Sequence, residues 1–111
     1  MIPTPGRILA YKLTALDAET INKRRNDLMF SGFAHENTGA QCHAGNGVSL
    51  GDVFPMIVTR VWVPGHGGAV NGQVLLDGND TLWVTSRTEQ LDEETGEPAM
   101  GYWAPFPGEE G

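Results

Sequence analysis

Residues 53–63, with the sequence VFPMIVTRVWV, give the strongest strand signal in this chain of 111 residues. Alternate residues of a strand point to opposite faces, and in this segment both alternating sets are apolar. A strand with two apolar faces is buried on both sides, either at the centre of a sheet or in the wall of a small closed barrel. We therefore expect this segment to be the centre of the fold, with the other elements arranged around it.

The flanking sequence predicts four more strands and one helix. The strands are rich in β-branched and aromatic residues and are expected over 7–13, 70–76, 81–87 and 101–104. The helix is expected over 15–28, because Thr14 can cap it and Asp17 places an anion in its first turn. The sequence thus predicts a mainly β, α+β fold. It is a small bent antiparallel sheet or an SH3-like barrel of about five strands, with the helix near the N-terminus.

The turn between residues 70–76 and 81–87 predicts a register for that hairpin. Its sequence is Asp77-Gly78-Asn79-Asp80, which favours a two-residue turn with Gly-Asn at the centre. This register pairs Val74 with Trp83, an aromatic side chain opposite a β-branched one.

The length and the charge distribution limit the organisation of the chain. One domain over residues 1–111 is expected, with a long glycine-rich loop at 31–51 and a flexible tail at 105–111. The formal net charge is −7, and residues 88–111 hold acidic residues without a single basic one. This balance disfavours nucleic acid and anionic membranes as partners. An acidic loop is expected at 88–99, either as a solvated segment or as a contact for a basic partner through Glu89, Glu93, Glu94 and Glu97.

Motifs of catalysis are missing from the sequence. The histidines and the single cysteine, which lack the spacing of a zinc site, are His35, Cys42, His43 and His66. No phosphate-binding Gly-Lys-Ser/Thr loop and no G-x-S-x-G elbow occurs. There is no apolar run of about 18 residues, so no membrane span is expected, and there is no signal-peptide pattern. A single cysteine forms no internal disulfide, which fits a reducing cytoplasm. We expect a protein that is not an enzyme and holds no cofactor, while metal binding by the loop of His35, Cys42 and His43 stays open.

The sequence does offer residues suited to ligand binding, namely one cation and a set of aromatic side chains. Arg60 lies in the middle of the central strand, where an unpaired charge is costly. A guanidinium next to aromatic rings suits a nucleotide-like ligand. The candidate ligand-binding residues are Arg60, Trp62, Asn71, Trp83, Tyr102 and Trp103. The alternative is structural: Trp62 and Trp83 would fill the core, and Arg60 would pair with Asp52 or Asp80.

Several motifs carry a resemblance to a known group of proteins. They are Gly6-Arg7-Ile8 with Tyr11, GDVFP at 51–55 followed by RVW at 60–62, LDGNDTLWVTS at 76–86, and Gly101-Tyr102-Trp103-Ala104-Pro105. With these motifs the chain resembles small accessory proteins of tailed phages of actinobacteria and their prophages. That group commonly ends in Gly-Thr-Trp-His-Trp-Pro, so the histidine and the second tryptophan are missing here.

The resemblance implies a phage gene product made in the cytoplasm of an infected host. Together with the candidate residues, it leads us to expect a non-catalytic protein that binds a host-derived ligand, most concretely a nucleotide-type immune signal. Two alternatives stay open: a virion component such as a decoration or head–tail protein, and an inhibitor that binds a host protein through the acidic segment. A homo-oligomer is compatible with each of them.

Overall fold

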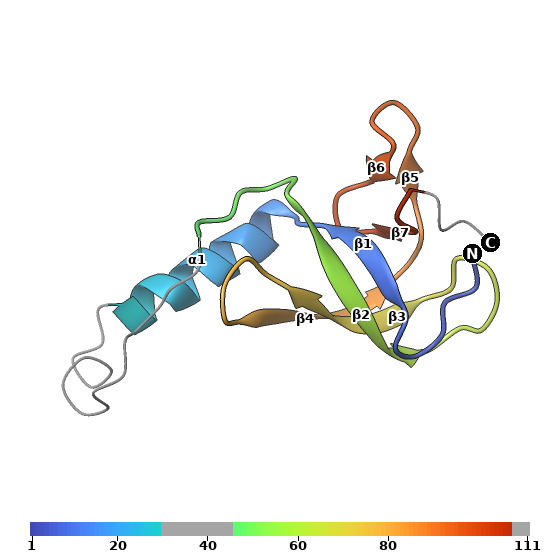
Figure 1. Ribbon diagram of the computed structural model, residues 1–111, viewed down its shortest axis with the longest axis horizontal. Coiled ribbons are helices and arrows are strands. Elements are labelled where there is room, and N and C mark those ends of the chain that lie inside the picture. Colours follow the sequence, from blue (N-terminus) through green and yellow to red (C-terminus); the bar gives the residue numbers. More distant parts are fainter. Residues whose placement is uncertain (30–45, 108–111) are drawn as a thin grey trace.

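The computed structural model describes residues 1–29 and 46–107 and contains one helix and a twisted sheet (Figure 1). In chain order the elements are β1 (Ile8–Lys12), α1 (Ala15–Met29), β2 (Val53–Val61), β3 (Val70–Leu75), β4 (Thr81–Arg87), β5 (Leu91–Asp92), β6 (Glu97–Pro98) and β7 (Trp103–Ala104). The strand order β4-β3-β2-β1-β7 forms one five-stranded antiparallel sheet. The expected small α+β fold is confirmed, with β2 as its central strand, and the sheet is not closed into a barrel.

The inner face of the sheet, which packs against α1, carries the core. Ala18 and Ile21 of α1 and Val48 contribute to one buried cluster together with Tyr11 and Trp103. The sheet supplies the other members of that cluster, among them Leu9, Met56, Val58, Val70, Val74, Leu82 and Val84.

Thr14 caps α1 as the sequence predicts. The Asp17 amide donates to the Thr14 hydroxyl at 3.0 Å, and the Asp17 carboxylate accepts from the Thr14 amide at 3.0 Å. This reciprocal pair satisfies two backbone groups at the helix start. The same carboxylate accepts from the Tyr11 hydroxyl at 2.7 Å, which joins β1 to the helix. Burial, followed by this hydrogen bond, raises the pKa of Tyr11 well above its usual value.

The segment predicted as an acidic loop, 88–99, instead contains a small hairpin of β5 and β6. Short polar contacts close its turn: the Asp92 carboxylate accepts from the Glu94 amide at 3.0 Å, and the Gly96 amide donates to the Asp92 carbonyl at 2.9 Å. Gly96 has a φ of 74°, a conformation that glycine adopts without a steric penalty. In Figure 1 the hairpin stands beside β1, at the opposite end of the molecule from α1.

The register predicted for the β3–β4 hairpin is wrong by one residue. Trp83 lies opposite Gln73, and Val74 lies opposite Leu82. The connection is longer than a two-residue turn because Leu76 turns into the core and Asp80 is bound by two arginines of α1. A shift of one residue moves every side chain to the other face. It therefore places Trp83 on the outside of the sheet and not in the core.

Asp80 joins the β3–β4 connection to α1. Its Oδ1 lies 2.8 Å from Arg25 Nη2, and its Oδ2 accepts from Arg25 Nε at 3.1 Å and from Arg24 Nη2 at 2.8 Å. The hydrogen bonds from Arg25, more than those from Arg24, lower the pKa of Asp80 from 3.8 to about 2. The carboxylate thus stabilises the fold at pH values above its unfolded pKa, and this contribution is lost as the pH falls from about 4 to about 2.

We predict that Asp80→Asn lowers the free energy of unfolding at pH 7 by about 2 kcal/mol. The difference from the wild type should shrink as the pH falls below 4, because the wild-type carboxylate is then protonated. Urea denaturation at several pH values measures both effects. Asp27→Asn is the control, since Asp27 pairs with Lys23 on the exposed surface of α1 and should contribute less than about 1 kcal/mol. Equal stability of Asp80→Asn and the wild type at pH 7 would contradict the prediction.

Candidate ligand-binding surface

The outer face of the sheet, opposite to the core, presents a row of side chains across four strands. Ile8, Ile57, Gln73 and Trp83 lie opposite one another in register on β1, β2, β3 and β4. Trp83 is 56% exposed and Ile8 is 45% exposed. The β5–β6 hairpin and residues 105–107 lie over the same face only near β1, where they line a groove with the buried Ala10. Within residues 1–29 and 46–107, Leu75 of β3 and Trp83 of β4 are thus left exposed on this face.

Arg60 and Trp62 form a stacked pair next to this row. The guanidinium carbon of Arg60 lies 4.1 Å from the centroid of the Trp62 ring, which is a cation–π contact. The acidic residues that the sequence offered as partners are used elsewhere: Asp52 accepts from the Ser49 amide, and Asp80 binds α1. Within residues 1–29 and 46–107, Arg60 forms no ion pair. Its charge is thus available on the outer face.

Asn71 holds the pair in place from the neighbouring strand. Its side chain is buried, with 6% exposed, and lies opposite Arg60. The Asn71 Oδ1 atom accepts a hydrogen bond of 2.8 Å from Trp62 Nε1 and one of 2.9 Å from the Ser86 amide. One side-chain oxygen therefore connects the end of β2 with β4.

The two strands that pair with β3, β2 and β4, each have a bulge opposite Asn71. On β2 the register shifts between Val58 and Arg60, and on β4 an extra residue lies between the partners of Val70 and Gly72. Ser86, in the second bulge, has a φ of 56°, which is rare for a residue with a side chain. Bulges of this kind re-aim the side chains that follow them.

The bulge on β4 brings Arg87 to the inner face. Arg87 lies opposite Val70, which is part of the core, and so points to the same side of the sheet. Without the extra residue, the alternation from the inward-facing Val84 would place Arg87 outside. Its guanidinium carbon lies 5.8 Å from the centroid of the Tyr11 ring.

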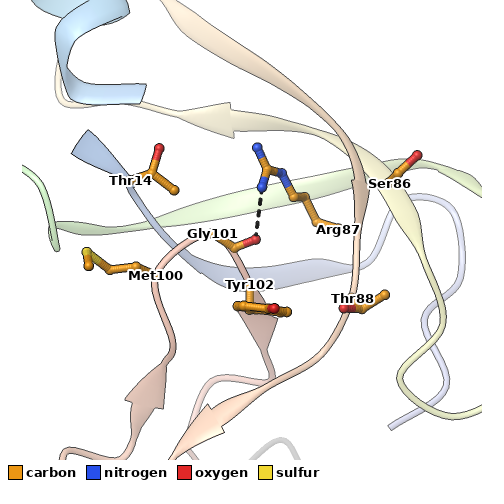
Figure 2. Close-up of a pocket in the computed structure, with 7 residues that line it drawn as sticks. All are labelled: Thr14, Ser86, Arg87, Thr88, Met100, Gly101 and Tyr102. Atoms are coloured by element: carbon orange, nitrogen blue, oxygen red, sulfur yellow. Dashed lines mark hydrogen bonds between the residues drawn. The ribbon is translucent and has the colours of Figure 1, made fainter. Parts of the chain in front are cut away.

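Arg87 lines a cleft of about 370 Å³ at the edge of the core (Figure 2). The other lining residues are Thr14, Ser86, Thr88, Met100, Gly101 and Tyr102. The sequence analysis did not single out Arg87. The only signal at this residue is its position as the last basic residue before the acidic segment.

The six predicted ligand-binding residues fall into three environments. Arg60, Trp62, Asn71 and Trp83 share the outer face, as described above. Tyr102 is half-buried and lines the Arg87 cleft. Trp103 is fully buried, pairs with Tyr11 and donates from Nε1 to the Arg87 carbonyl at 3.0 Å, so it supports the cleft from within the core.

The four predicted acidic contact residues lie in different environments. Glu89 lies 3.7 Å from the amino group of Met1, and Glu97 lies 3.0 Å from Lys12 Nζ. Glu93 and Glu94 are exposed in the turn between β5 and β6. Two of the four carboxylates thus have partners inside the molecule.

Other classes of site find no support in the described part of the chain. In residues 1–29 and 46–107 no three histidine, cysteine or acidic side chains gather as metal ligands, and His66 is exposed. The loop with His35, Cys42 and His43 lies outside the described residues. The helix within these ranges is not one that could cross a bilayer.

Comparison of the chain with models of known families, with curated proteins and with solved structures found no match.

We predict that the bulge at Ser86 inverts the usual preference of a strand for a β-branched residue over glycine. At Ser86, glycine should give a more stable protein than valine by about 1 kcal/mol, because a β-branched residue is strained at positive φ. At Thr81, which is exposed and lies in register with Leu75 on the regular part of β4, valine should be more stable than glycine by about 1 kcal/mol, as in an ordinary strand. Urea denaturation of the four variants measures both differences. The same order at both positions would contradict the bulge.

Proposed function

We propose that the protein is a non-catalytic binding protein that sequesters an extended, nucleotide-type ligand on the outer face of its sheet. The observation that carries this proposal is the exposed Trp83 on the same face as the Arg60–Trp62 pair. A tryptophan ring offers a stacking platform for a base. A guanidinium stacked on an indole keeps its N–H edge free for two-pronged contact with a phosphate.

The spacing of the two groups favours an extended ligand. Trp83 and Arg60 stand on strands two positions apart and are offset by two residues along β3, from Gln73 to Asn71. At about 4.8 Å per strand and about 3.4 Å per residue, they are separated by roughly 12 Å. Gln73 lies between them, and its side-chain amide can pair with the edge of a base. Cyclic dinucleotides and ADP-ribose-type molecules have this length and combine bases with phosphates. The resemblance to phage accessory proteins makes signalling nucleotides of an infected host cell the first class to test.

A flat apolar patch favours a protein partner as the second candidate function. Trp62, Trp83, Ile8 and Leu75 are between 36% and 56% exposed on this face. Interfaces between proteins are rich in tryptophan and arginine and are flatter than small-molecule sites. A second copy of the chain or a host protein would then cover the outer face.

We predict that a cyclic dinucleotide or ADP-ribose binds the full chain and quenches tryptophan fluorescence, with heat detected by calorimetry. Trp83→Ser and Arg60→Gln should each weaken binding at least about tenfold, because each removes one of the two main contacts. Lys23→Gln, at an exposed cation on α1, should leave the affinity unchanged. The ligand should be recovered chemically intact.

Three outcomes would count against the proposal. Absence of heat and quenching with every nucleotide at millimolar concentration overturns the nucleotide as ligand. Equal binding by Trp83→Ser and the wild type overturns the outer face as its site. A dimer in solution that dissociates on Trp83→Ser favours the second candidate instead.

A further inference from the structure

The guanidinium of Arg87 has most of its hydrogen-bonding capacity unused. An arginine side chain carries five N–H donors. Within the described residues Arg87 makes one side-chain hydrogen bond, from Nη1 to the Gly101 carbonyl at 3.3 Å, and no ion pair. Its Nε atom is buried and has no hydrogen-bond partner in this part of the chain. Buried donors in this state are uncommon and call for an explanation such as a bound ion or water.

The surrounding residues hold Arg87 in position without neutralising it. Its backbone carbonyl accepts from the buried Trp103 indole, and its side chain lies over the Tyr11 ring. The Asp17 carboxylate, close to the same ring, is already used by the Tyr11 hydroxyl and the Thr14 amide. The positive charge is therefore fixed at the edge of the core, and no carboxylate in residues 1–29 and 46–107 pairs with it.

The space in front of the guanidinium has the size and lining of a small-molecule site. Its volume of about 370 Å³ falls within the range of roughly 300–1,000 Å³ that is typical of ligand pockets. Figure 2 shows the guanidinium beside Thr14 and above Gly101, with the Tyr102 ring beyond Gly101. Hydroxyl groups of Thr88 and Tyr102 and the apolar side chain of Met100 contribute to the lining.

We propose that this cleft binds a small oxyanion, the phosphate or carboxylate group of a low-molecular-weight ligand, through the guanidinium of Arg87. A planar guanidinium pairs with two oxygens of such a group at once, and these charge-assisted hydrogen bonds are stronger than neutral ones. The site is separate from the outer face, since Arg87 shares the side of Val70 and Arg60 the side of Asn71. It does not depend on the function proposed above.

The test is an NMR titration of the ¹⁵N-labelled full chain with inorganic phosphate and, separately, with acetate, each against sodium chloride at the same ionic strength. The expected result is a saturable shift of the Arg87 Nε–H signal and of the Gly101 and Tyr102 amides, with the Nε–H signal of Arg24, which lies on α1 and pairs with Asp80, unchanged. The anion that saturates at the lower concentration identifies the preferred group. No saturable shift at Arg87 with either anion, or equal shifts at Arg24 and Arg87, overturns the proposal.

A pair of charge-matched variants tests the same site without changing its arginine. Met100 lines the cleft and is 50% exposed, so Met100→Glu adds a carboxylate beside Arg87 at little cost to packing. This carboxylate should weaken binding of the preferred anion at least about tenfold, since it competes for the guanidinium. Leu91→Glu adds the same charge at a residue that is 49% exposed and outside the cleft lining, and should leave the affinity within about twofold. Equal weakening by both variants would mean a general charge effect and would overturn the site.

Discussion

The side-chain oxygen of Asn71 is the point on which the functional surfaces depend. It is a buried acceptor at the second residue of β3, and asparagine is uncommon in strands. It takes hydrogen bonds from the Trp62 indole and the Ser86 amide, one from each side of β3. A buried oxygen with two donors is well satisfied, whereas a donor left without it would pay the full cost of desolvation. The two bulges that flank Asn71 are thus held by the same atom.

Because of these bulges, two arginines lie on opposite faces of one sheet. The first leaves Arg60 outside, stacked on Trp62, and the second turns Arg87 inward, over Tyr11. Lys12, Lys23, Arg24 and Arg25 have carboxylate partners. Arg60 and Arg87 each lie against an aromatic ring instead and, within the described ranges, form no ion pair. The formal net charge of the chain is −7, so both cations stand in an acidic molecule.

Local sequence signals predicted α1 and the five strands of the main sheet, whereas the segment of the β5–β6 hairpin was predicted as a loop. The doubly apolar pattern of 53–63 identified the central strand, and Thr14 with Asp17 identified the helix start, because both signals depend on near neighbours in the chain. The register of β3 and β4 was predicted wrongly, since the interaction of Asp80 with Arg24 and Arg25 joins residues 55 and 56 positions apart. The inward turn of Arg87 could not be predicted either, as it depends on a bulge that Asn71 stabilises from another strand. Trp103 was predicted as a ligand contact and is a core residue, because its pairing with Tyr11 is also long-range.

The most direct test of this account is hydrogen exchange at the two protons that Asn71 binds, the Trp62 indole N–H and the Ser86 amide. In Asn71→Asp, which keeps an acceptor oxygen, both protons should exchange slowly, as in the wild type. In Asn71→Leu both should exchange at least about tenfold faster, while the Leu13 amide, bonded to the Asp52 carbonyl at 2.9 Å, stays protected and reports an intact fold. Unchanged protection of the Trp62 and Ser86 protons in Asn71→Leu would contradict the account.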